Sequence, residues 1–329
     1  MDLSTGTSGN IKFTTTTKKI YNHTNLEFND YNLQLGEEDN EEEYKEGQHS
    51  TSKKWGQLKL LSCELLFLSL YSNDIDIVIY VGAAKGTHIY VLANLFNTIS
   101  FHLYDTMPFD KKLKKCSNIT MFNNYFTDTN IKEYNQMGKK YLFISDIRNL
   151  TYDRNKINMR KNQDMIWKDM LLQQQWLTVL NFKYAFLKFR LPYPEDFVVS
   201  KYGDTIDYLD GVLFKQPYTS SMSTETRLLV DGSKLKFRKW NLKKYESKMF
   251  YHNKIIRQNY NYTNIFTKDD TDIYPGKVFK HLTGDFMLTR DYDSTYFSYA
   301  VQKYMKKINV ANNITNFKKL CNYIISNNT

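Results

Sequence analysis

IDIVIYVGAAKGT, the stretch from Ile75 to Thr87, decides the fold. Its first seven residues, Ile75–Val81, are mostly β-branched and apolar, which is typical of a strand buried on both faces of a sheet. A turn of small residues follows between Gly82 and Gly86, and residues 87–96 have the pattern of a helix. A buried strand, a glycine turn and a helix in this order predict one unit of a parallel α/β sheet.

Strand and helix patterns continue to alternate along the chain. We expect strands at residues 101–104, 119–125, 141–145, 184–189, 211–214 and 227–230, and helices at residues 57–68 and 163–180, with one or two more within 296–325. The strand signal weakens after Asp231. This alternation predicts a Rossmann-like α/β fold, with a mostly parallel, doubly wound sheet flanked by helices.

The first 50 residues differ in composition from the rest of the chain. They hold ten acidic and four basic side chains and end in an acidic run at residues 37–43, whereas the whole chain has a net charge of +10. We predict a flexible acidic arm over residues 1–52 and a single domain with a basic C-terminal part over residues 53–329. A body so basic suits nucleic acid as a partner, although a lysine-rich proteome would give the same excess.

The cysteines and the apolar stretches of the chain indicate the cellular compartment in which the protein works. Cys63, Cys116 and Cys321 lie far apart without metal-ligand spacing, so we expect neither a disulfide framework nor a metal site. The N-terminus has no apolar run of the kind found in signal peptides, and the longest apolar stretch, residues 58–71, is too short to span a bilayer. We therefore expect a protein of a reducing compartment, cytoplasmic or nuclear, without membrane contact.

Three features converge on the carboxyl ends of the predicted strands, where open α/β sheets bind ligands. Gly82 and Gly86 permit a close approach of the backbone to a ligand, Asp105 ends the second strand and Asp146 ends the fourth. An acid at the end of the second strand can accept hydrogen bonds from both hydroxyls of a ribose. The turn lacks the G-x-G-x-x-G pattern and the Walker lysine frame, so a nucleoside cofactor without phosphates, S-adenosylmethionine, fits better than a nicotinamide dinucleotide.

Residues 232–260 combine nine lysines or arginines with one acid, Glu246. Aromatic side chains lie between them, namely Phe237, Trp240, Tyr245, Phe250, Tyr251 and Tyr260. Cations interleaved with aromatics suit RNA, whose backbone is anionic and whose bases stack on rings. A solvated helix face with an apolar stripe toward the core explains the same pattern equally well.

Six patches of the chain, in this order and spacing, are similar to one known family. They are Gly56–Leu61, Tyr80–His88, Ile144–Arg148, Leu187–Pro194, Thr224–Leu229 and Tyr245–Tyr251. Together they resemble the poxvirus-type cap-specific mRNA 2′-O-methyltransferases, which double as the small, regulatory subunit of poly(A) polymerase. The similarity runs from about Trp55 to Asn259.

The resemblance implies a class I S-adenosylmethionine-dependent methyltransferase fold. It also implies methyl transfer to the ribose 2′-hydroxyl of the first transcribed nucleotide of capped mRNA, with S-adenosylhomocysteine as the product. Capped mRNA and a poly(A) polymerase catalytic subunit are the partners it suggests. A chain so rich in asparagine and lysine suits an AT-rich genome such as that of a large cytoplasmic DNA virus, which would place the protein in the cytoplasm, a viral factory or the virion.

The family's catalytic lysine, aspartate, lysine and glutamate match Lys59, Asp146, Lys188 and Glu225. A ribose hydroxyl is a poor nucleophile at neutral pH, so a lysine kept neutral can accept its proton and a charged lysine can stabilise the alkoxide. We assign Lys188 to act on the hydroxyl, with the other three positioning it and adjusting its pKa. The cofactor contacts carried over are Gln57, Tyr80, Gly82, Gly86, His88, Asp105, Ile147 and Arg148. Met107 and Lys85 depart from the family, which has arginine and proline there.

Cap recognition is also implied by the resemblance. N7-methylguanine is positively charged, so it stacks between aromatic rings and binds carboxylates. Tyr193 matches one ring and Glu195 and Glu246 match the carboxylates, with phenylalanine and aspartate in the family at the first two positions. Tyr44 is the candidate for the second ring, and another aromatic of the family's pocket is replaced near Met222.

Two other functions remain open from the sequence. One is a catalytically idle, RNA-binding processivity subunit of a poly(A) polymerase, and the other is a methyltransferase for another RNA position or a small molecule. The complete tetrad favours an enzyme, because a subunit that only binds RNA needs no neutral lysine beside a glycine turn. The cap-type carboxylates and aromatics favour a capped substrate.

Overall fold

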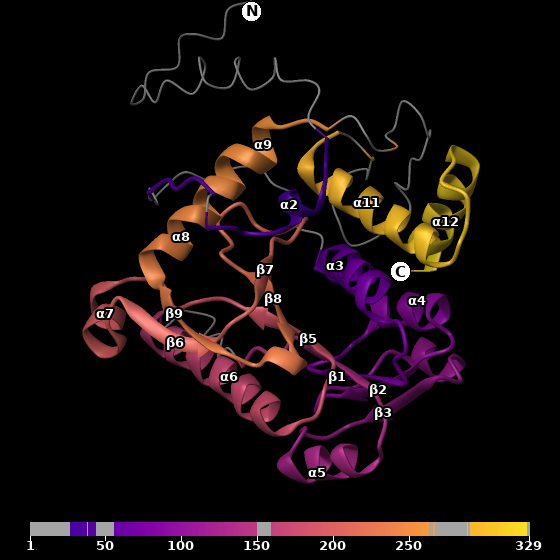
Figure 1. Ribbon diagram of the computed structural model, residues 1–329, viewed down its shortest axis with the longest axis horizontal. Helices are drawn as coiled ribbons and strands as arrows, with labels where there is room; N and C mark the ends of the chain where they lie inside the picture. Colours follow the sequence, from indigo (N-terminus) through magenta and orange to yellow (C-terminus); the bar gives the residue numbers. More distant parts are fainter. Residues whose placement is uncertain are drawn as a thin grey trace, which may run out of the picture.

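The computed structural model describes residues 27–37, 39–43, 56–149, 159–262, 266, 288 and 290–327. Its main sheet has seven strands in the order β3-β2-β1-β4-β5-β8-β7 (Figure 1). The strands are β1 (Ile77–Val81), β2 (Ser100–Tyr104), β3 (Ile119–Phe122), β4 (Tyr141–Ser145), β5 (Tyr184–Phe189), β7 (Val212–Phe214) and β8 (Thr226–Asp231). Strands β1 to β5 are parallel, and β8 runs antiparallel to both β5 and β7.

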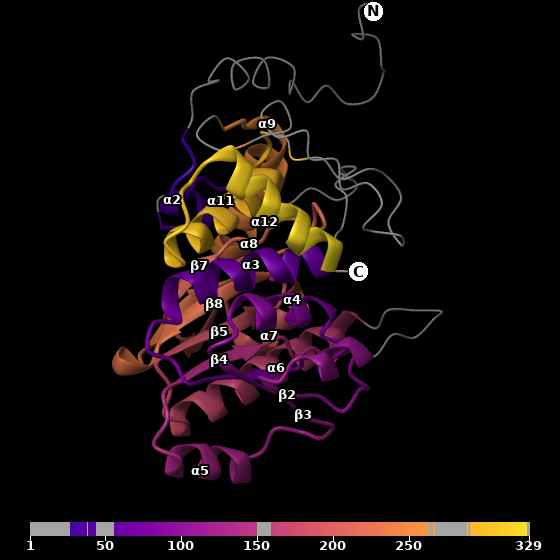
Figure 2. The same cartoon turned by 90° about the vertical axis from the view of Figure 1, so that its right-hand side faces the viewer.

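One face of the sheet is covered by two layers of helices. Helices α3 (Gly56–Tyr71) and α4 (Thr87–Leu95) pack on the strands, and α11 (Tyr292–Lys307) and α12 (Ile314–Asn327) lie outside them (Figure 2). Buried strand residues such as Val78 and Tyr80 belong to the same apolar cluster as these helices. The broad apolar surface of α3 is buried because it lies between the sheet and α11.

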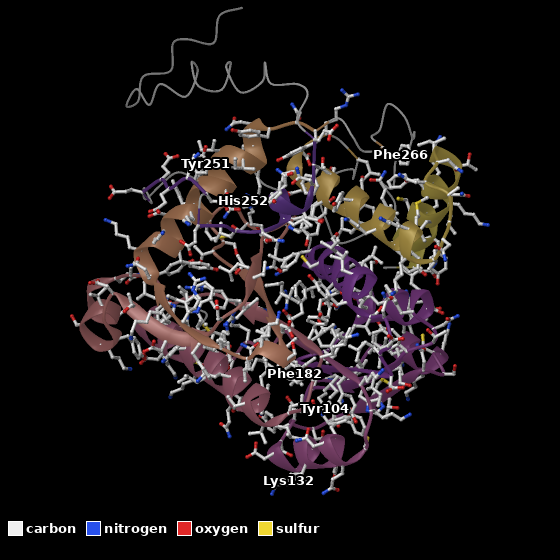
Figure 3. All side chains as sticks on the ribbon, viewed as in Figure 1. Tyr104, Lys132, Phe182, Tyr251, His252 and Phe266 are labelled. Carbon is white, nitrogen blue, oxygen red and sulfur yellow. The ribbon has the colours of Figure 1, made fainter. Side chains whose placement is uncertain are left out.

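The other face carries α5 (Asp128–Gln136), α6 (Met159–Val179) and a second sheet of β6 (Thr205–Leu209) and β9 (Phe237–Asn241). Helices α7 (Asp196–Tyr202) and α8 (Leu242–Tyr251) flank this small sheet in Figure 1. Side chains fill the space on both faces of the main sheet (Figure 3). The shorter elements are α2 (Asp30–Leu33), η1 (Lys111–Lys115), η2 (Gly232–Lys234), a π-helical turn η3 (His252–Ile256) and α9 (Arg257–Asn259).

The predicted fold class is confirmed: the chain has a Rossmann-like fold with a mostly parallel sheet between helices. Each predicted strand and helix is present, and the final region forms two helices, α11 and α12. Strands β6 and β9 were not predicted. In β9 only Trp240 is buried, so the strand lacks the alternation by which a half-buried strand is identified.

Part of the predicted acidic arm, residues 27–37 and 39–43, packs on the domain. Phe28 and Leu33 are each 1% exposed. The rings of Phe28 and Tyr262 pack edge to face, with their centres 5.0 Å apart. The backbone N–H of Leu35 donates to the carbonyl of Leu213 at 2.8 Å. Residues 27–37 and 39–43 are therefore held against the domain, a feature that their acidic composition conceals; residues 1–26 and 44–55 lie outside the described residues.

The three cysteines, Cys63, Cys116 and Cys321, are buried and unpaired. Within the described ranges, no helix is long and apolar enough to cross a membrane. The same ranges hold no group of three or more histidine, cysteine, aspartate or glutamate side chains that could hold a metal ion.

Gly82 closes the contact between the loops that follow β1 and β4. Its φ is +79°, and a Cβ at this position would lie 2.8 Å from the backbone nitrogen of Ile147 and 2.9 Å from the carbonyl carbon of Asp146. The N–H of Asp146 also donates to the carbonyl of Val81 at 2.9 Å. Only glycine combines this left-handed conformation with so close an approach.

We expect Gly82→Ala to be more destabilising than a matched glycine substitution. Gly138→Ala is the control, because Gly138 has a φ of +63° but nothing within 4 Å of the added Cβ. The left-handed conformation alone should cost about 1–2 kcal/mol in either variant. The backbone clash at Gly82 should add about 1–3 kcal/mol. Urea unfolding measures the stability of both variants, and equal destabilisation would show that the loop after β4 yields freely.

Candidate active site

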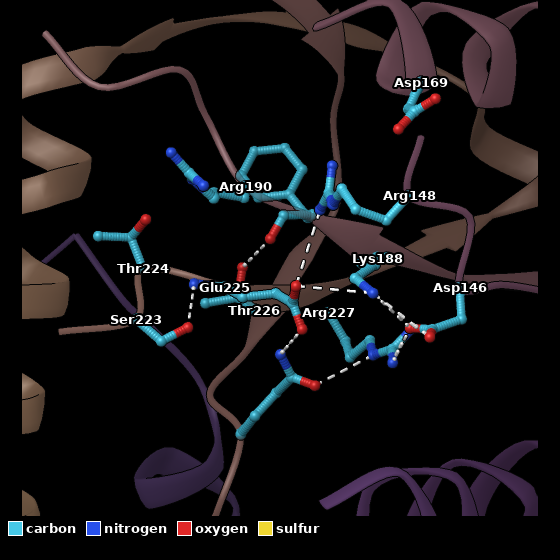
Figure 4. Close-up of polar contacts among 12 residues, drawn as sticks. Asp146, Arg148, Asp169, Lys188, Arg190, Ser223, Thr224, Glu225, Thr226 and Arg227 are labelled. Carbon is cyan, nitrogen blue, oxygen red and sulfur yellow. Dashed lines mark hydrogen bonds and ion pairs between the residues drawn. The ribbon is translucent and has the colours of Figure 1, made fainter. Parts of the chain in front are cut away.

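Four elements bring the predicted catalytic side chains to the carboxyl ends of the parallel strands. Figure 4 shows three of them, Asp146, Lys188 and Glu225, side by side. Lys59 lies in the first turn of α3, Asp146 follows β4, Lys188 lies near the end of β5 and Glu225 precedes β8. Because β8 is antiparallel to β5, with Arg227 opposite Lys188, the start of β8 lies beside the end of β5. The antiparallel strand therefore carries Glu225 to the edge where the parallel strands end.

Lys188 lies between two carboxylates. Its Nζ is 3.3 Å from both oxygens of Asp146 and 3.7 Å from Oε2 of Glu225. Lys59 Nζ donates to Oε1 of Glu225 at 2.6 Å. These four side chains are 12–17% exposed, so they interact with one another with little screening by water.

Two arginines complete the cluster. Arg227 is fully buried, and its Nη2 is 2.5 Å from Oδ1 of Asp146 while its other nitrogens donate to the Ser145 carbonyl and to Gln216, each at 3.2 Å. Arg148, predicted as a cofactor contact, has Nη2 3.8 Å from Oε2 of Glu225. Arg227 was not predicted as a site residue, although a cation directly before the apolar run Leu228–Val230 is a signal for such a buried pair.

The cluster holds four cations and two carboxylates. This excess of positive charge favours the ionised form of the carboxylates and disfavours the charged form of Lys188. Burial opposes charge on Asp146 and Glu225, but Lys188 and the neighbouring cations outweigh it, so the pKa of Asp146 is lowered and that of Glu225 lies well below its usual value. Burial lowers the pKa of Lys188, and the positive charges of Lys59 and Arg148 lower it further. The two carboxylates raise it, but they do not offset the effect of burial. Lys188 is therefore a group poised to lose its proton while the carboxylates stay ionised.

A cavity of about 550 Å³, a size suited to a small ligand, opens beside this cluster. Gly82, Asp105, Ile147 and Arg148, all predicted cofactor contacts, line it, and it extends to Lys188. The two Asp105 oxygens accept from the backbone N–H groups of Ala84 at 2.9 Å and Met107 at 2.8 Å. These bonds fix the carboxylate at the cavity wall and leave lone pairs for a ligand.

The other four predicted cofactor contacts, Gln57, Tyr80, Gly86 and His88, do not line this cavity. Tyr80 and His88 are buried and hydrogen-bond the same carboxylate, Glu64, at 2.7 and 3.1 Å. Oε1 of Gln57 lies 3.1 Å from Nδ1 of His88. Gly86, with a φ of +78°, begins α4. Gln57, Tyr80 and His88 therefore belong to one hydrogen-bonded network with Glu64, which was not predicted because it is embedded in an apolar helix. A contact of these four residues with the cofactor stays a prediction.

The predicted cap-binding residues lie partly together. Tyr193 and Glu246 line a small cavity of about 10 Å³ near Met222, and Glu195 is absent from its lining. The guanidinium of Arg190 lies 3.9 Å from the centre of the Tyr193 ring. Burial, with the negative charge of Glu195, raises the pKa of Glu246. Tyr44, the predicted second ring, lies outside the described residues.

The structure separates the two explanations of the basic region, residues 232–260. Trp240, Tyr245 and Phe250 are 3–5% exposed and belong to the interior, so for these three rings the structure favours the apolar stripe toward the core. Phe237 is 53% exposed. Most cations of β9 and α8 remain at the surface, so this stretch is a basic surface over an aromatic core.

Comparisons with known proteins agree with the geometry. The sequence model of the family described as "Poly A polymerase regulatory subunit" matches residues 27–319. The chain is 31% identical over 255 residues to the cap-specific mRNA (nucleoside-2'-O-)-methyltransferase of Myxoma virus (strain Lausanne), covering 70% of this chain and 72% of that protein. It is 30% identical over 244 residues to the protein of the same name from Fowlpox virus (strain NVSL), covering 69% and 75%.

Among solved structures, bluetongue virus VP4, whose description is a multifunctional RNA-capping production line, is 17% identical with a TM-score of 0.40. The alignment covers 67% of this chain and 38% of that one. A likeness at this level says nothing about function.

We expect Glu225→Gln to make stability less sensitive to acid. The pKa of Glu225 is well below 4.5 in the folded protein, so its charge stabilises the fold at neutral pH and this contribution disappears as the pH falls through the folded value. The variant should be less stable near neutrality and lose less stability on acidification. Denaturant unfolding from about pH 7 to about pH 3 measures this.

Glu246→Gln is the matched control. The pKa of Glu246 is raised, because protonation removes the cost of burying its charge. Its stability should fall more steeply with acid than that of the wild type. Equal acid dependence of Glu225→Gln and wild type would contradict the ionised state assigned to Glu225.

Proposed function

The chain belongs to the family of poly(A) polymerase regulatory subunits, and from this premise we propose that it is a cap-specific mRNA 2′-O-methyltransferase. The observation that carries the proposal is Lys188, which is held between Asp146 and Glu225 and lines the same cavity as Asp105. The methyl group would go from S-adenosylmethionine to the 2′-hydroxyl of the first transcribed nucleotide of capped RNA. The lowered pKa of Lys188 supports its role as the group that accepts the hydroxyl proton.

The residues that line the cavity fit S-adenosylmethionine. Asp105 would accept hydrogen bonds from the ribose hydroxyls, and Gly82, whose missing Cβ lets the loop after β4 approach, lines the same cavity. Asp146 and Arg148 bring opposite charges to the end nearest Lys188, where an amino-acid group with both charges has partners. When bound, the cofactor supplies a methyl group already activated by a positively charged sulfur.

The protein's own part in the reaction is to orient a hydroxyl and remove its proton. Asp146 and Glu225 hold Lys188 Nζ from two sides and so fix its direction. Lys59 and Arg148 disfavour a further positive charge on Lys188, which favours its neutral form in a fraction of molecules. Once Lys188 has accepted the proton, the same two carboxylates stabilise its charge.

The candidate cap site involves residues close to Arg190. A methylated guanine would take the place of the Arg190 guanidinium on the face of Tyr193, because both are flat cations. Glu246 and Glu195 would then accept from the guanine edge, and the raised pKa of Glu246 reflects burial that the nearby cations do not offset. This exchange would enlarge a cavity that now holds about 10 Å³.

The family description favours a second role alongside the enzyme. We propose that the chain also acts as the regulatory subunit of a poly(A) polymerase, binding that enzyme's catalytic subunit and RNA. The basic surface of residues 232–260 supports RNA binding. This role does not depend on the chemistry at Lys188.

We expect Lys188→Arg to abolish methyl transfer while leaving ligand binding nearly intact. Arginine keeps the positive charge but does not release its proton at these pH values. The rate of radiolabelled methyl transfer from S-adenosylmethionine to capped RNA should fall by about 10²-fold or more. In the wild type the rate should rise with pH until Lys188, whose pKa is lowered from 10.5, is largely deprotonated.

Lys183→Arg is the matched control, because Lys183 lies just before β5, is exposed and donates to the carbonyl of Asn73 at 3.0 Å. Its rate should equal that of the wild type. Near-normal turnover of Lys188→Arg would show that another group accepts the proton. A wild type that transfers no methyl group would leave only the regulatory-subunit role.

For the cap, we expect tighter binding of N7-methylated than of unmethylated guanosine cap analogues, because methylation creates the charge that stacks on Tyr193. Tyr193→Ala should remove most of this preference, measured by calorimetry, and leave S-adenosylmethionine binding unchanged. Tyr323→Ala on α12 is the control, since Tyr323 is 38% exposed and does not line the candidate site. Equal affinities for the two analogues in the wild type would rule out this cap site.

A further inference from the structure

A groove of about 450 Å³ lies outside the candidate active site, between residues 34–37 and the surface formed by β9 and α8. Its lining includes four cations from this surface, Arg238, Lys239, Lys244 and Lys248, together with Glu37. The Arg238 guanidinium lies 4.1 Å from the centre of the Trp240 ring, which holds it over a buried aromatic. We call this feature the α8 groove.

The Glu37 carboxylate forms ion pairs with cations of the α8 groove. Its oxygens are 2.7 Å from Arg238, 2.9 Å from Lys244 and 3.6 Å from Lys248. Hydrogen bonds from Lys244 and then Arg238 lower the pKa of Glu37 to about 2. The side chain is nevertheless 62% exposed, so this anion sits in a cationic site that is open to solvent.

Two acidic residues after Glu37 form further ion pairs, one with a buried lysine after β7 and one with a lysine of α8. Asp39 lies 3.3 Å from Lys215, and Glu43 lies 3.1 Å from Lys243. Lys243 also acts on Glu246, the candidate cap-binding carboxylate, whose pKa it lowers against the stronger effect of burial. The line of ion pairs therefore runs from the α8 groove to the neighbourhood of the candidate cap site.

We propose that the α8 groove binds a phosphate of the RNA backbone and that Glu37 occupies this place until RNA displaces it. This role rests on the proposed function insofar as RNA is the substrate. A phosphodiester offers the same negative charge and paired acceptor oxygens as a carboxylate, and Arg238 can bind either with two N–H groups. RNA is favoured over an acidic protein because α8 also carries Glu246, so an RNA bound by its cap there starts beside this surface.

The test measures binding of an uncapped oligoribonucleotide to the full chain by fluorescence anisotropy over a series of salt concentrations. Glu37→Gln removes the competing anion and should tighten binding by about three- to tenfold near 0.1 M salt. Arg238→Gln should weaken binding by a similar factor and reduce the slope of log K against log salt by about 0.7, the value for one phosphate on a single strand. Lys244→Gln is a second variant of the same kind, and it leaves the stacking of Arg238 on Trp240 in place.

Two controls lie on α5, at the end of the molecule remote from α8 (Figure 3). Glu133→Gln and Lys132→Gln change the net charge by the same amounts as the groove variants, at exposed positions. Neither should reproduce the change in affinity of its counterpart. A change of equal size in the controls would assign the effect to net charge and overturn the proposal.

Unchanged or weaker RNA binding by Glu37→Gln would show that Glu37 only fastens its segment to α8, and would overturn the proposal. Unchanged binding by both Arg238→Gln and Lys244→Gln would also overturn it. An oligoglutamate of equal charge that binds more tightly than the RNA would assign the groove to an acidic protein instead. Methyl transfer is assayed separately, so a wild type without that activity would refute the proposed enzyme and leave the binding result to decide the groove.

Discussion

The buried ion pair between Arg227 and Asp146 organises the active-site end of the sheet. A fully buried guanidinium is tolerated only when it is paired and hydrogen-bonded, and Arg227 finds Asp146 at 2.5 Å with the Ser145 carbonyl and Gln216 beside it. The pair joins β8 to the loop after β4, across the intervening β5. It therefore sets where Glu225, two residues earlier, meets Lys188. Removing either partner would leave an uncompensated charge in the interior.

This arrangement explains why a lysine stands at the centre of the cluster. Asp146 stays ionised because Lys188 and Arg227 overcome the effect of burial on its pKa, so it cannot itself take a proton near neutral pH. Burial and the neighbouring cations Lys59 and Arg148 lower the pKa of Lys188, whereas neither arginine releases its proton near neutral pH. The charges around Lys188 therefore set the pKa of its amine. The excess of cations in the cluster also attracts a polyanionic substrate.

The fold could be predicted from local patterns, because Ile75–Thr87 carries both the strand period and the glycines that its turn requires. The tetrad came from the resemblance, since periodicity does not say that Lys59 on a helix faces Glu225 before a distant strand. Arg227 and Glu64 were missed because burial of a charge depends on tertiary partners. For the same reason the sequence did not show that Tyr80 and His88 both bind the buried Glu64, which no local pattern identifies.

Two sites in the molecule are occupied by the chain's own charged groups. The Arg190 guanidinium covers the ring of Tyr193, and the Glu37 carboxylate takes the cations of the α8 groove. If capped RNA binds at both, its methylguanine replaces one internal cation and a phosphate replaces one internal anion. Each exchange subtracts an existing interaction from the affinity gained. The cost of displacing Glu37 is common to capped and uncapped RNA, so it lowers both affinities and cancels from the difference between them. The cost of displacing Arg190 falls only on an RNA whose cap enters the site, so the preference for capped transcripts is the gain of the methylguanine at Tyr193 less the loss of the Arg190 contact.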